Sequence, residues 1–252
     1  YRASNGEPLD TVRAVGAGRV VYANREAGQS SYGKYVVVEH RWGDSPFYSL
    51  YAHLSDILVD SGAYVRPGDH LARMGYTGRG INRRRAHVHV EIAMLLNEDF
   101  QPWYDTYFSR EPNYHSIFSG LNLKGMDVTE LFQRQHEDPN LTIQEFVLEQ
   151  EVAYTVTVPT NGGLDLLNRY PWLWQGASSA PDSLSTVAIG FTRTGLPVRV
   201  TAAAQTVDHP QLAGVEDSML HQQCATNGVL RKRRSECRVG RRGERYLQLI
   251  AM

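Results

Sequence analysis

Glycines divide the stretch from Thr11 to Leu96 into short runs in which apolar and polar residues alternate. Alternation with a period of two residues is typical of strands that bury one face, and glycine favours the tight turns between them. The pattern therefore predicts antiparallel β-structure, and it requires no helix before residue 100. The predicted strands are Arg19–Ala23, Tyr35–His40, Phe47–Leu54, His70–Met74 and His87–Leu95.

Residues 99–150 differ from this pattern. They begin with an aromatic-rich stretch, which we interpret as an ordered linker packed on the first part of the chain. Two short helices are expected next, starting at Asp127 and Thr142, because each of these residues has a glutamate three positions later, the spacing of a capping box.

Strand-like runs return in residues 151–252, at 153–158, 187–191 and 197–202, with Thr194-Gly195 as a hairpin turn. The chain of 252 residues is therefore expected to be mainly β, with a β core at 1–98, the linker and helices at 99–150, and a smaller α+β domain of unknown role at 151–252.

Composition limits the possible partners. The formal net charge is −1, so no overall field attracts nucleic acid or an anionic membrane, and no stretch has the roughly 20 apolar residues of a membrane span. The first residues are polar, so we expect an internal fragment whose signal or anchor lies upstream. Two cysteines, Cys224 and Cys237, could be bonded or free.

Histidines carry the strongest chemical signal. His87 and His89 are two residues apart in a predicted strand and so share one face, while His53 ends another predicted strand. Imidazoles placed in this way can bind zinc or act on a substrate, and isolated histidines can equally be structural.

The chain resembles LytM/lysostaphin-type zinc metallopeptidases in five ordered stretches. These read YGKYVVVEH from Tyr32, SLYAHLS from Ser49, GAYVRPGDHLA from Gly62, GYTG from Gly75 and HVHVE from His87.

This resemblance implies an antiparallel β-domain, the barrel-sandwich-like duplicated hybrid motif, that holds one Zn²⁺ through His, Asp and His with a water. It implies His89 as a metal ligand, and His53 and His87 as the imidazoles that act as base and stabilise the oxyanion. The expected activity is that of a zinc endopeptidase on peptidoglycan stem peptides or cross-bridges, in the periplasm or outside the cell, with no nucleic acid partner.

Two departures from the family pattern affect the site. The family's first motif, a His followed by an Asp, would precede Tyr1, so the zinc site is expected to be incomplete in this chain; we interpret Asp10 as a turn residue. A basic loop leads into His87, and its Arg83, Arg84 and Arg85 are candidates for a substrate groove that selects acidic groups, or a solvated loop.

Other features remain open at this point. Glu91 is either a partner that orients an imidazole or a solvent-facing strand residue. The basic run Arg231–Arg234 either holds an anionic polymer or forms a solvated hairpin tip. The alternative function is a catalytically inactive relative that binds cell wall or regulates another hydrolase. A biotinyl- or lipoyl-type carrier is excluded because no lysine occupies the expected hairpin tip.

Overall fold

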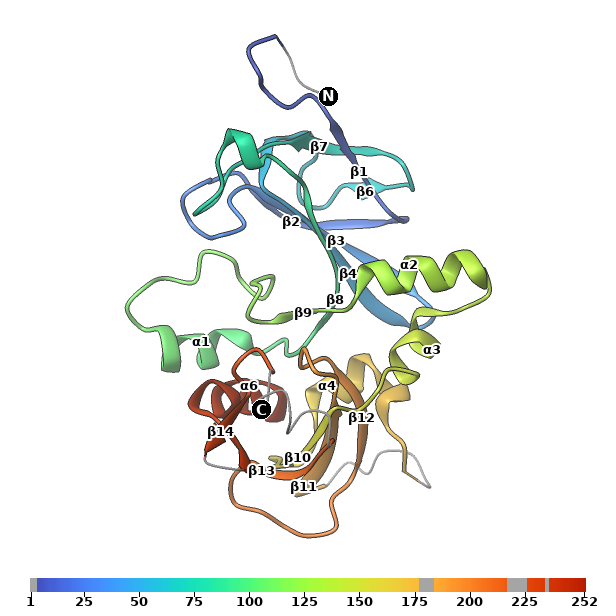
Figure 1. Cartoon of the computed structure of the whole chain (residues 1–252), viewed down its shortest axis with the longest axis vertical. Coiled ribbons are helices and arrows are strands. Elements are labelled where there is room, and N and C mark those ends of the chain that lie inside the picture. The colour runs from blue at the N-terminus through green and yellow to red at the C-terminus, as the bar shows by residue number, and fades with distance from the viewer. Residues whose placement is uncertain (1–3, 177–183, 217–225, 234–235) are drawn as a thin grey trace. The chain divides into compact units, whose positions relative to one another are not determined.

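The computed structural model describes residues 4–176, 184–216, 226–233 and 236–252. The chain forms two compact units (Figure 1). The first contains residues 1–95 and 113–133, and the second contains residues 96–112 and 134–252.

A six-stranded antiparallel sheet is the framework of the first unit (Figure 1). Its order is β6-β2-β3-β4-β8-β9, and a three-stranded antiparallel sheet, β1-β7-β5, accompanies it. The strands are β1 (Thr11–Arg13), β2 (Gly18–Asn24), β3 (Tyr35–Trp42), β4 (Ser45–Ala52), β5 (Leu54–Ile57), β6 (Tyr64–Val65), β7 (His70–Met74), β8 (His89–Leu95) and β9 (Leu123–Gly125).

Strand β3 shows how the first unit builds its core. Val36 and Val38 belong to the hydrophobic cluster that includes residues of the three-stranded sheet, such as Leu71. Tyr35 and Val37 point to the opposite face, into a second cluster. Because successive side chains of a strand point to opposite faces, the central strands are buried on both sides.

The second face of this sheet is covered by the segment from Asn113 to Asn122. Phe118 packs in the second cluster, the Tyr35 hydroxyl donates to the Phe118 carbonyl at 3.2 Å, and the Tyr22 hydroxyl donates to the Tyr114 carbonyl at 2.7 Å. This part of the aromatic stretch therefore packs on the β core.

The predicted strand Phe47–Leu54 is wrong as a single element. It divides into β4 and β5 at His53, whose φ of 61° lies in the left-handed region. The predicted strand His87–Leu95 begins two residues later, at His89, and His87 instead forms an isolated bridge with Gly75. A residue with left-handed backbone conformation interrupts the regular hydrogen bonding of a strand, and the periodicity of the sequence does not show where such a residue lies.

Helix α1 (Phe100–Phe108) replaces the first part of the predicted linker. Its aromatic residues at positions 100, 103, 104 and 107 have helical spacing, and Phe100 and Trp103 are buried within the second unit. The two predicted capped helices are confirmed as α2 (Val128–Glu137) and α3 (Ile143–Leu148). The Glu130 N–H donates to Asp127 at 3.0 Å, and Thr142 and Glu145 form a complete capping box.

The second unit contains an antiparallel sheet of order β12-β11-β10-β13 and the hairpin β14-β15. Its elements include β10 (Tyr154–Pro159), α4 (Asp165–Arg169), the 3₁₀ turn η2 (Pro171–Leu173), β11 (Thr186–Phe191), β12 (Pro197–Ala202), β13 (Gln211–Val215), β14 (Leu230–Arg233), β15 (Glu236–Val239) and α6 (Arg241–Ala251). The predicted hairpin turn is confirmed between β11 and β12, where Gly195 has a φ of 89°.

Two sequence features of the second unit fall partly outside the described residues. Arg231 lies in β14, whereas Arg234 is not described. Cys237 in β15 is disulfide-bonded, and Cys224 lies outside the described residues. Among the helices that the structure describes, none combines the length and apolar character that a membrane crossing requires.

Candidate metal centre

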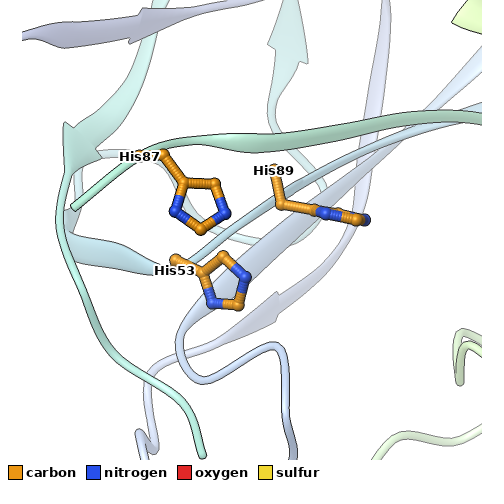
Figure 2. Close-up of side chains that lie close together, drawn as sticks. All are labelled: His53, His87 and His89. Carbon is orange, nitrogen blue, oxygen red and sulfur yellow. The ribbon is translucent and has the colours of Figure 1, made fainter. Parts of the chain in front are cut away.

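Three imidazoles meet at one end of the six-stranded sheet. His53 joins β4 to β5, His87 lies just before β8, and His89 is the first residue of β8. Their ring centroids are 4.8 Å apart for His53 and His87 and 5.8 Å apart for His53 and His89 (Figure 2). Within the described part of the chain, this group could hold a metal ion, because one nitrogen of each ring lies within 4.8 Å of the others.

Strand register brings the three rings together. Residue Ala52, next to His53, pairs with His89 across β4 and β8. On the other side Leu54 pairs with Met74, whose neighbour Gly75 bridges to His87. The left-handed backbone at His53 stands between these two pairings and sets the direction of its ring. A strained conformation of this kind in a non-glycine residue is typical of functional sites.

Two backbone carbonyls orient His53 and His87. Nδ1 of His53 is 2.9 Å from the Thr77 oxygen, and Nδ1 of His87 is 2.7 Å from the Arg85 oxygen. A carbonyl only accepts hydrogen bonds, so both Nδ1 atoms carry the proton. In the neutral ring, Nε2 of each histidine therefore keeps its lone pair.

His89 is held through its other ring nitrogen, Nε2. Its Nε2 is 2.6 Å from Glu91 Oε1, and the Tyr32 hydroxyl donates to the same oxygen at 2.7 Å. The hydrogen bond to Glu91 raises the pKa of His89, and partial burial opposes this shift. Nδ1 of the neutral ring is left with the lone pair, so all three histidines have one nitrogen available for a ligand bond.

Glu91 is one of the candidates from the sequence, as a partner that orients an imidazole, whereas Tyr32 has no role predicted from the sequence. The strand spacing of His89 and Glu91 is a signal in the sequence, since residues two apart share a face. Tyr32 lies 59 positions from Glu91, and only the pairing of strands brings it near. A Cβ at Gly120 would lie 2.6 Å from the Tyr32 hydroxyl, so a glycine is needed for this close approach.

Thr77 is a second residue that sequence analysis missed. Its hydroxyl donates to the Leu54 carbonyl at 2.8 Å and accepts from the Lys34 N–H at 3.0 Å. The adjacent Gly78 has a φ of 102°, and a Cβ there would lie 2.2 Å from the Ser31 oxygen. These contacts hold the Thr77 carbonyl against His53.

The electrostatic environment keeps His53 neutral. Burial is the largest cause that lowers its pKa, the hydrogen bond to Thr77 opposes it, and the neighbouring imidazoles lower it further. His53 is 7% exposed, whereas His87 is exposed, so the group opens to solvent on the side of His87.

Other candidate residues occupy different positions. Arg83, Arg84 and Arg85 form the exposed 3₁₀ turn η1 (Arg83–Arg85) just before His87. Asp10 lies outside the histidine group, and its carbonyl accepts from the Met74 N–H at 2.9 Å. His40 is fully buried between the Ala17 carbonyl and the Ser49 hydroxyl, which explains it as a core residue.

The three imidazole nitrogens are donors of a type that binds zinc. Imidazole nitrogens with free lone pairs are common zinc ligands, and hydrogen bonds from their second nitrogens are the usual means of fixing ring orientation. The group contains no carboxylate among the described residues.

Part of the chain matches a known protein family. The family model of peptidase family M23 matches residues 1–102. Lipoprotein NlpD of Yersinia enterocolitica is 34% identical over 89 residues, which are 35% of this chain and 79% of that protein. The chain belongs to peptidase family M23.

Other relatives match over stretches of similar length. Outer membrane antigenic lipoprotein B of Haemophilus influenzae is 35% identical over 88 residues, and the NlpD/LppB homolog lipoprotein of Pseudomonas aeruginosa is 36% identical over 87 residues. The matched segments cover 35% and 34% of this chain. They span only 20% and 25% of those relatives.

Solved structures that are similar to part of the chain include a zinc-containing peptidase from Vibrio cholerae, with 31% identity and a TM-score of 0.27; the match covers 32% of this chain and 23% of that one. The lysostaphin catalytic domain from Staphylococcus simulans has 25% identity and a TM-score of 0.28. That match covers 34% of this chain and 59% of the lysostaphin domain.

Proposed function

We propose that this M23 chain is a zinc-dependent endopeptidase that hydrolyses peptide bonds of bacterial peptidoglycan. The observation that supports it most is the convergence of three histidines, each with one nitrogen held by a hydrogen bond and the other available. A purely structural cluster has no need to keep one nitrogen available in each of three neighbouring rings.

His89 is the proposed zinc ligand, through Nδ1, because Glu91 occupies its Nε2. The chemistry that a bound zinc ion would supply is Lewis acidity, which polarises the carbonyl of the scissile bond and makes a water molecule more acidic. Glu91 and Tyr32 act as positioning residues: Glu91 fixes the ring of His89 and increases its basicity, and the Tyr32 hydroxyl holds the Glu91 carboxylate in place.

His53 and His87 are the proposed groups that move protons, through Nε2. When Nε2 takes up a proton, the ring keeps its Nδ1–H bond to the Thr77 or Arg85 carbonyl, so it does not have to reorient. The imidazolium formed in this way can donate to the oxyanion or return the proton to the leaving amine.

Several relatives are outer-membrane or other lipoproteins by name, which supports a place in the cell envelope, the compartment in which peptidoglycan would be the substrate. The alternative is an inactive M23 relative that binds cell wall or regulates another hydrolase.

Zinc content and peptide release from purified peptidoglycan, measured on the full-length protein, test the proposal. We expect His53→Ala and His87→Ala each to lower the rate about 100- to 10,000-fold if the residue carries the proton. His70→Ala is the control, because His70 is an exposed histidine of the same unit. Cell-wall binding without zinc and without peptide release would favour the inactive alternative.

A further inference from the structure

The loop that joins β7 to β8 carries an unusual concentration of positive charge. Four of its residues are exposed arginines, namely Arg79, Arg83, Arg84 and Arg85. One carboxylate, Glu7, is recorded as an ion-pair partner of this group within the described residues, at 3.8 Å from Arg83.

The same loop holds two imidazoles of the candidate site. The Thr77 carbonyl accepts from His53, and the Arg85 carbonyl accepts from His87. Arg79 is two residues from the first of these anchors and Arg84 is adjacent to the second. The backbone that carries both arginines therefore borders the histidine group.

The turn η1 has a defined shape. The Asn82 side chain caps it by accepting from the N–H groups of Arg84 at 3.0 Å and Arg85 at 3.3 Å. A capped turn presents its side chains from a fixed backbone, so fewer conformations are lost when a ligand binds.

The four arginines differ in their contacts. Arg83 donates to the Asn5 carbonyl at 2.9 Å, and Arg85 donates to the Gly80 carbonyl at 3.3 Å. Among the residues that the structure describes, the side chains of Arg79 and Arg84 have no hydrogen-bond or ion-pair partner. These two cations are available to an anion from outside the chain.

We propose that Arg79 and Arg84 bind a carboxylate of the substrate beside the histidine group, so that the chain prefers acidic peptides. A guanidinium matches a carboxylate in charge and in planar geometry. This inference rests on the proposed peptidase function for the identity of the ligand as a peptide. The preference itself is a binding property and can be measured without turnover.

Two peptides of identical sequence, one with glutamate and one with glutamine at a single position, provide the test. Binding of each to the full-length, zinc-loaded protein is measured by fluorescence anisotropy, and cleavage is followed in parallel. We expect the acidic peptide to bind about fivefold more tightly, the effect of one exposed ion pair of about 1 kcal/mol. The difference should disappear at about 1 M salt, where the screening length is about 3 Å.

Arg84→Gln and Arg79→Gln are expected to reduce this preference, and the double variant is expected to abolish it. Arg66→Gln is the matched control, because Arg66 is an exposed arginine of the same unit outside this loop. Equal binding of both peptides by the native chain, or a preference that survives in the double variant, would overturn the proposal. Displacement by inorganic polyphosphate but not by excess acidic peptide would also overturn it, in favour of a phosphate ligand.

The readouts separate the two hypotheses. A preference in binding without cleavage of either peptide would support the carboxylate site and contradict the peptidase function. Cleavage of both peptides at equal rates, with equal binding, would support the peptidase function and contradict the carboxylate site.

Discussion

Removal of one hydroxyl, in Tyr32→Phe, should weaken metal binding at His89 without changing any proposed ligand. The Tyr32 hydroxyl donates at 2.7 Å to the carboxylate that holds His89. A hydrogen bond to a charged group contributes about 1.5–3 kcal/mol. The Glu91 side chain is 19% exposed, so water replaces part of this interaction and the lower end of the range applies. About 1.5 kcal/mol corresponds to a roughly tenfold loss of zinc affinity.

Zinc affinity of Tyr32→Phe is measured by competition with a chromophoric chelator. Thermal unfolding of the metal-free protein is measured in parallel, to separate a local effect from loss of the fold. Tyr64→Phe is the control, because Tyr64 is 71% exposed in the same unit. Unchanged affinity in Tyr32→Phe, or an equal loss in Tyr64→Phe, would refute the role assigned to the hydroxyl.

Three further predictions follow from the same contacts. Gly120→Ala places a Cβ 2.6 Å from the Tyr32 hydroxyl, so it should lower zinc affinity as Tyr32→Phe does, as measured in the same titration. Burial lowers the pKa of His40, and the hydrogen bond to the Ala17 carbonyl opposes this shift. Near pH 6.5 the unfolded chain therefore binds a proton at His40 that the folded chain does not bind. The free energy of unfolding should therefore fall as the pH drops below about 6.5 and level off below the folded pKa. Urea unfolding at several pH values gives the slope of this free energy against pH. That slope should be smaller by up to about 1.4 kcal/mol per pH unit in His40→Gln, but not in His70→Gln. Thr142→Ala removes the capping box of α3 and should lower the stability of the second unit by about 1 kcal/mol, measured by denaturant unfolding; an unchanged midpoint would contradict it.

Local chemistry explains which parts of the fold could be predicted. The capped starts of α2 and α3 depend on a side chain and a backbone N–H three residues apart, so a short stretch of sequence specifies them. The aromatic spacing of α1 carried a helical signal as well, and the reading of that stretch as a linker missed it. Strands β2, β3 and β7 were recognised from their alternation and from the glycines that bound them.

The histidines themselves were evident from the sequence. His87 and His89 share one short segment, and His53 belongs to a stretch that resembles the M23 pattern. Family membership rests on those residues, and so does the expectation that His89 binds metal. The role of each histidine stays a prediction, as does the substrate.

The sequence alone determined the family, the β-rich class of the first unit and the identity of its candidate histidines, because these depend on residue types and spacings along the chain. Only the tertiary structure decided how the rings are held: the Thr77 and Arg85 carbonyls, the Glu91 and Tyr32 pair, and the left-handed backbone of His53. Two of these contacts join residues far apart in the sequence, namely Thr77 with His53 and Tyr32 with Glu91. Strand pairing creates them, and no local pattern records which distant residue will donate the hydrogen bond.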